Sequence, residues 1–86
     1  MTTTLRTFHH DEVGYRAWLD SADPLAWVLN EWGDGPDDRM LHHASCSHIN
    51  YVDDNMYTET RKLCGAYIRD LRDRLILGYQ SCSDCQ

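Results

Sequence analysis

The sequence predicts one small α+β domain with a three-stranded antiparallel sheet and two helices. Apolar residues recur at helical spacing over 11–22 and again over 68–76, which predicts the helices. Two runs of strand-favouring residues flank a segment with two glycines and a proline at 33–38, a pattern typical of a β-hairpin. The chain has 86 residues, enough for a single domain.

The first predicted helix begins at Asp11 and ends by Ala22. Its apolar residues include those at positions 13, 17 and 18, which fall on one face at helical spacing. Aspartate is a common N-cap, and acidic side chains in the first turn suit the helix dipole. Pro24 excludes a continuation, because the residue before a proline avoids α-helical backbone angles.

The segment before this helix is polar. Residues 1–7 are predicted to be a loose N-terminus and residues 8–86 to be the domain, although Leu5 and Phe8 could start an edge strand. The N-terminus has no apolar signal region, and the chain has no run of about 18 apolar residues. We therefore expect a cytoplasmic protein without a membrane-spanning segment.

The hairpin is predicted from residues 25–32 and 39–43. In the first run, small or branched residues alternate with Trp27 and Leu29, as in a strand. Between the runs, glycines permit positive φ and Pro36 prevents strand pairing. The two runs are therefore predicted to pair across this turn.

The third strand is predicted over residues 57–64, which are rich in aromatic and β-branched side chains. Gly65 would separate it from the last helix, whose apolar stripe contains Ile68, Leu71, Leu75 and Ile76. A single longer helix from Thr58 is the alternative, because the helical spacing extends back to Cys64. Gly78 is the predicted helix terminator.

The net charge of −6 comes from 14 acidic and 8 basic residues. Nucleic-acid binding usually needs a basic surface, so this balance disfavours it, apart from a local patch of Arg69, Arg72 and Arg74. An acidic surface fits solubility, or docking on a basic protein partner.

Four cysteines in a protein expected in the cytoplasm indicate metal binding or redox chemistry instead of disulfides. Cys82 and Cys85 form a Cys-x2-Cys pair that can bind one ion from a tight turn. His42 and Cys46 form a second half-site where a strand runs into a loop. Together these four side chains give the tetrahedral sulfur–nitrogen set that Zn²⁺ prefers in closed structural sites. They predict a C-terminal zinc knuckle.

The segments Met40–Cys46 and Gly78–Cys85 resemble the metal-binding half-sites of small bacterial zinc modules similar to the Ada-type metal-binding domain. The resemblance implies a metal-stabilised fold. It does not imply methyl transfer, because this chain is acidic and has His42 where the repair proteins have a cysteine. The rest of the chain resembles uncharacterised bacterial small proteins, through residues 11–19, 27–30 and 62–64.

Two points of the metal site stay open in the sequence. Cys64 is either a buried thiol or an alternative fourth ligand in place of His42, since free cysteine is a commonly buried residue. The Cys82–Cys85 pair could also be a redox pair, but such pairs usually begin a helix behind a strand. His43 is predicted to face the opposite side of its strand from His42.

No set of residues in the sequence assembles into a catalytic motif, so we expect no enzymatic activity. The predicted function is a zinc-binding module that acts as a protein-interaction adaptor or regulator. Trp32, near the hairpin turn, is the tryptophan most expected to be exposed for a partner. The alternative is a nucleic-acid-associated accessory module in DNA repair, restriction or phage biology, which a cluster of the three arginines with exposed aromatic residues would favour.

Overall fold

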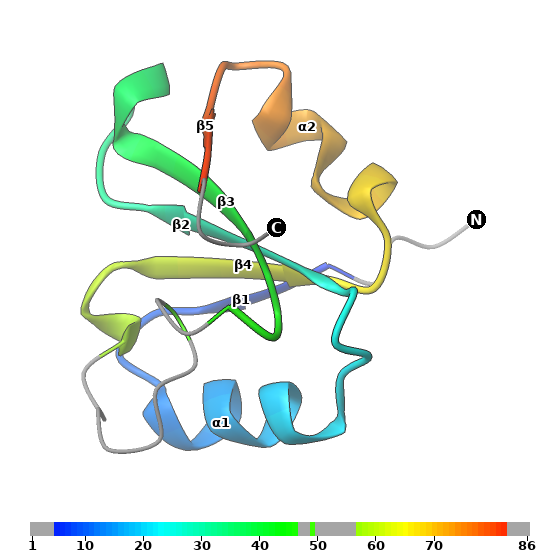
Figure 1. Ribbon diagram of the computed structural model, residues 1–86. Coiled ribbons are helices and arrows are strands. Elements are labelled where there is room, and N and C mark those ends of the chain that lie inside the picture. Colours follow the sequence, from blue (N-terminus) through cyan, green and yellow to red (C-terminus); the bar gives the residue numbers. More distant parts are fainter. Residues whose placement is uncertain (1–4, 47–48, 50–56, 83–86) are drawn as a thin grey trace.

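A five-stranded sheet with helical segments packed on both faces forms the centre of the protein (Figure 1). The computed structural model describes residues 5–46, 49 and 57–82. The strands are β1 (Arg6–Phe8), β2 (Trp27–Glu31), β3 (Arg39–His43), β4 (Arg61–Gly65) and β5 (Gln80–Ser81). The helices are α1 (Glu12–Ser21) and α2 (Arg72–Leu75), with 3₁₀ turns η1 (Pro36–Asp38), η2 (Tyr57–Glu59) and η3 (Ile68–Leu71).

The strand order is β1-β4-β2-β3-β5. The β1–β4, β4–β2 and β2–β3 pairs are antiparallel, and the β3–β5 pair is parallel. The predicted α+β class is therefore confirmed, but the prediction of a three-stranded antiparallel sheet is wrong. The three predicted strands form the centre, and β1 and β5 add an edge on each side. These two edge strands span three and two residues, too few to give a periodic pattern in the sequence.

The alternation of side chains gives the sheet two buried faces. On the face towards α1, Val28, His42 and Cys64 lie in one row across three strands, and Tyr15 and Leu19 of α1 pack over this face. On the other face, one leucine from each central strand packs against the segment of η3 and α2, in a cluster formed by Leu29, Leu41, Leu63 and Leu71. The helical segments therefore cover opposite sides of the same three strands.

The start of α1 is close to the predicted position. The Asp11 side chain accepts a hydrogen bond from the Gly14 N–H at 3.0 Å, so Asp11 is the N-cap as predicted. Glu12 accepts hydrogen bonds from both the N–H and the hydroxyl of Thr58, at 2.6 and 2.8 Å. These bonds hold η2 against the helix, and β4 begins only at Arg61. The first part of the strand predicted over 57–64 is therefore a 3₁₀ turn, because polar contacts to α1 replace strand pairing.

The predicted last helix is short. Residues 68–71 form η3, and α2 ends at Leu75, so Ile76 lies beyond it with 72% of its surface exposed. Gly78 follows with φ 99° and donates its N–H to the Leu75 carbonyl at 3.0 Å. A positive φ suits glycine, so this residue ends the helical segment as predicted. No helix in the described part of the chain is long and apolar enough to cross a membrane.

A buried carboxylate lies on the α2 face. Glu31 is paired with Arg39 across β2 and β3 and with Arg61 across β2 and β4. Its Oε2 lies 2.7 Å from Nε of Arg39 and 3.4 Å from a guanidinium nitrogen of Arg74. The Oε1 atom of Glu31 lies 3.0 Å from Nε of Arg61. Glu31 and Arg39 are both almost fully buried, whereas the side chains of Arg61 and Arg74 are 38% and 45% exposed, so Arg39 is the buried partner of this carboxylate. The carboxylate of Glu31 therefore connects β3 to β2 through Arg39, and α2 to the sheet through Arg74.

We predict that Arg39→Leu lowers the free energy of unfolding by about 3 kcal/mol, because it leaves the buried carboxylate of Glu31 with only its two partly exposed partners, Arg61 and Arg74. Urea unfolding followed by circular dichroism measures the change. Arg74→Leu is the control, since that side chain is 45% exposed and its loss should cost at most about 1 kcal/mol. Equal losses in the two variants would contradict the assignment of Arg39 as the main partner of Glu31.

Candidate metal centre

The position of His42 follows from the register of β3. Its Cα lies opposite Val28, so its side chain faces the α1 side and is buried. The next residue, His43, faces the other side, where its ring lies 4.0 Å from that of Trp27. The prediction that the two histidines face opposite sides is therefore confirmed. The strand directs one imidazole to each face.

A tight turn after β3 brings Cys46 back towards His42. The Cys46 N–H donates to the His43 carbonyl at 3.0 Å, and the Ile49 N–H donates to the Cys46 carbonyl at 3.2 Å. The carbonyl of Ile49 accepts a hydrogen bond from the buried Tyr15 hydroxyl at 2.7 Å. These bonds attach the turn to α1 and keep Cys46 in the core of the α1 face.

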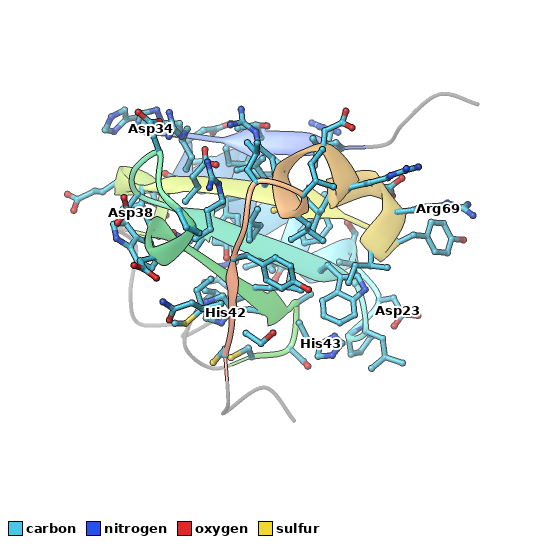
Figure 2. All side chains as sticks on the ribbon, turned by 90° about the horizontal axis from the view of Figure 1, so that it is seen from above. Asp23, Asp34, Asp38, His42, His43 and Arg69 are labelled. Carbon is cyan, nitrogen blue, oxygen red and sulfur yellow. The ribbon has the colours of Figure 1, made fainter. Side chains whose placement is uncertain are left out.

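The parallel β3–β5 pair brings in Cys82. Leu41 is paired with Ser81, and the N–H of Cys82 donates to the Leu41 carbonyl at 3.0 Å. The chain therefore passes beside His42 at the residue after β5, as the course of β5 past His42 shows (Figure 2). Cys82 is buried there, although the two residues of β5 itself are exposed.

The side chains of His42, Cys46 and Cys82 form a buried cluster. One donor atom from each lies within 4.8 Å of the other two, and the two sulfur atoms are 3.9 Å apart. In a tetrahedral zinc site with Zn–S bonds of about 2.3 Å, two sulfurs are about 3.8 Å apart. The spacing of the cysteines therefore matches two ligands of one zinc ion, and this cluster could hold a metal ion.

The donor set defines the chemistry of this cluster. Two thiols and one imidazole suit zinc better than calcium or magnesium, which bind oxygen ligands. Among the described residues, no carboxylate belongs to the cluster. Cys85, the predicted fourth ligand, lies outside the described residues. The structure thus brings together three of the four predicted ligands.

Cys64, the alternative fourth ligand, does not belong to this cluster. It lies in the same row of the sheet as His42, but Val28 of β2 stands between them. Adjacent strands are about 4.8 Å apart, so the two backbones are roughly 10 Å apart. Burial raises the pKa of the Cys64 thiol from 9.0 to about 12, with Lys62 and Arg6 opposing the shift. This cysteine is a protonated core thiol at neutral pH.

Sequence reasoning missed the buried ion pair of Glu31 and Arg39. The signal was present, because the two residues have opposite charges and each stands near the turn end of a predicted strand of the hairpin. It also missed how the tail joins the sheet, since Gln80 and Ser81 carry no strand pattern. The pairing of the tail with β3 is what places Cys82 beside this strand.

Comparisons with protein-family models, with curated proteins and with solved structures found no match. The metal-site hypothesis rests on the geometry of His42, Cys46 and Cys82.

We predict that Cys82→Ala weakens zinc binding on the order of a hundredfold, because a structural site distributes roughly 10–16 kcal/mol over four ligands. Competition with a chromogenic chelator measures the affinity. Cys64→Ala is the matched control and should bind zinc like the wild type, since Cys64 lies outside the cluster. A loss of similar size in both variants would contradict this ligand assignment.

The raised pKa of Cys64 predicts a pH dependence of stability. The unfolded thiol loses its proton near pH 9 and the folded one near pH 12, so its contribution to stability is complete below pH 9. Between pH 9 and 12 this contribution should fall by at most about 1.4 kcal/mol per pH unit. Urea unfolding of the wild type and of Cys64→Ala should show that the difference in their free energies of unfolding becomes smaller from pH 9 to pH 12. Parallel pH profiles would contradict the prediction.

Proposed function

We propose that this protein is a non-enzymatic module that binds a structural zinc ion and acts as a protein-interaction adaptor or regulator. The ligands are His42, Cys46, Cys82 and Cys85. The observation that carries the proposal is the buried cluster of the first three of these residues, with its sulfur–sulfur distance of 3.9 Å.

A structural role for the metal is supported by the burial of all three described ligands. A catalytic zinc keeps one position open to water and usually has a general base nearby. Here no carboxylate of the described residues belongs to the cluster. The ligands come from β3, from the turn after it and from the end of β5, so a bound ion would join three segments. Joining these segments would add stability to a domain whose small core supplies little of it.

A role in protein interaction is supported by the charge and by the exposed apolar residues. The chain is acidic, which disfavours direct contact with phosphates. Trp32 is 47% exposed, as expected from the sequence, and follows β2 directly into a turn that contains the exposed Asp34 and Asp37. Exposed tryptophan is a common anchor in protein interfaces.

Nucleic-acid association is the second candidate, supported by one observation. The guanidinium of the exposed Arg69 lies 4.6 Å from the centre of the Tyr67 ring, an arrangement that can also stack on a base. Arg74, however, is paired with Glu31, and the exposed Asp73 lies in the same helical segment. These features leave too little positive charge for a phosphate-binding surface, so we favour a protein partner.

We expect native mass spectrometry of the untagged protein to show one zinc ion per chain. Removal of the ion with a chelator should lower the thermal midpoint strongly or abolish folding, because metal binding contributes to folding free energy. Circular dichroism before and after chelation measures this change, and added zinc should reverse it.

Cadmium or cobalt substitution gives a second readout of the same site. Cobalt bound in a tetrahedral site with thiolate ligands should give visible d–d bands and a near-ultraviolet thiolate-to-cobalt charge-transfer band, and the Cys46→Ala variant should lose or weaken both. A protein that is folded without metal and does not bind added zinc would refute the proposal.

A further inference from the structure

We propose that the surface formed by η3 and α2 is the docking site for a protein segment that carries a large apolar side chain next to acidic residues. The inference rests on the proposed role in protein interaction and names the chemistry of the partner. It concerns the face of the sheet opposite His42, so it does not depend on the metal ligands themselves.

The first observation is a shallow apolar hollow. It has a volume of about 300 Å³ and is lined by Ile68, Leu75 and Ile76, with Arg69 and Arg72 completing its wall. These five residues define what we call the α2 groove. Its apolar residues are poorly covered, since Ile68 is 43% exposed and Ile76 72% exposed. Contiguous exposed apolar surface of this kind marks interaction sites in soluble proteins.

The α2 groove continues into a second hollow. That hollow has a volume of about 560 Å³ and shares Ile68 and Arg69 with the groove. Its further lining includes Leu25, Trp27 and Tyr67, with one acidic residue, Asp23. Five of the eight exposed large apolar side chains of the described residues belong to the segment 67–79. The two hollows thus form one extended surface, long enough for more than a single side chain.

The second observation is the charge around the groove. Arg69 and Arg72 are exposed, and no carboxylate of the described residues forms an ion pair with either. Arg69 lies at one end of the molecule, far from Asp34 and Asp38 in the hairpin turn (Figure 2). In a chain with net charge −6, the α2 groove itself is lined by two arginines and no carboxylate, above an apolar floor. It complements a partner segment that has carboxylates beside its apolar anchor.

The apolar floor favours a protein segment over a nucleic acid. Binding of single strands combines aromatic stacking with a basic track for the phosphates. Here two isoleucines and a leucine form the floor of the groove, and only two arginines lie beside it. A leucine, isoleucine or phenylalanine side chain would bury apolar surface on this floor, which a nucleotide would not.

Selection from a phage library of random peptides against the zinc-loaded full-length chain tests this proposal. We expect the enriched peptides to carry a large apolar residue flanked by aspartate or glutamate. Synthetic copies, labelled with fluorescein, should bind the wild type in an anisotropy titration. Arg72→Glu and Ile76→Asp should each weaken the binding about tenfold or more.

Two variants control for charge alone. Val13→Asp adds the same charge at a residue of α1 that is 84% exposed, and Arg6→Glu reverses an exposed charge on β1. Both should bind the peptides like the wild type. Far-UV circular dichroism and the zinc content of each variant show whether the fold and the metal site are intact, so a failure of metal binding is recognised separately from a failure of the groove.

Several results would overturn the proposal. One is a selection that enriches no peptides, or enriches neutral or basic ones. Another is binding that Arg72→Glu and Ile76→Asp leave unchanged. Retardation of a single-stranded DNA or RNA probe that Arg72→Glu abolishes would assign the surface to nucleic acid instead. A concentration-dependent dimer in analytical ultracentrifugation that Ile76→Asp dissociates would assign it to a second copy of the chain.

Discussion

The buried guanidinium of Arg39 connects the parts of this small fold that are distant in sequence. It forms an ion pair with Glu31 of the neighbouring strand and donates hydrogen bonds to the carbonyls of Asp34 and Gly35 in the hairpin turn. The same group donates to the carbonyl of Gly78 at 3.4 Å, between α2 and β5. A guanidinium offers five N–H donors in a fixed plane, so one side chain can hold the hairpin and the tail together. Glu31 supplies the compensating charge without which this arrangement would be unstable.

The candidate metal centre depends on the contact between Arg39 and Gly78, because this contact sets the path of the chain that follows. Because Gly78 is fixed beside the start of β3, the chain leaves it alongside β3, and two residues of parallel pairing suffice to bring Cys82 next to His42. A two-residue strand at a sheet edge contributes little by itself. The cluster with Cys46 lies on the α1 face, whereas Arg39 and Glu31 lie on the α2 face, so the tail is attached to both faces of the sheet.

The sequence was most informative where one local rule dominates. The turn residues at 33–38 and the alternation beside them predicted β3 at its observed bounds, and the capping aspartate placed the start of α1. It failed where tertiary contacts override local preference. Tyr57 and Thr58 favour strands, yet hydrogen bonds to Glu12 hold this segment in a 3₁₀ turn. The edge strand β5 exists only because the fold brings it to β3, which no property of Gln80 or Ser81 indicates.

For the candidate site, the spacing of cysteine and histidine predicted the three described side chains that come together, but it left the role of Cys64 open. That question depends on strand order, because β2 separates β4 from β3. Cys64 and His42 face the same side and look equivalent in the sequence. Only the sheet shows that Val28 lies between them. The two-residue period of a strand shows which face of the sheet each side chain occupies. The sequence alone does not show which strands are neighbours in that sheet.

The metal centre and the α2 groove lie on opposite faces, yet one short segment links them. Leu75 and Ile76 belong to the groove, Gly78 follows two residues later, and Cys82 ends the segment beside His42. The Cβ that any other residue would add at Gly78 would lie 2.5 Å from Cβ of Pro36, so this turn fits tightly against the hairpin. A zinc ion at Cys82 would hold β5 in place, and only four residues separate the end of α2 from the start of β5. Through this short connection, a metal at Cys82 would restrain the end of α2, which borders the proposed docking surface.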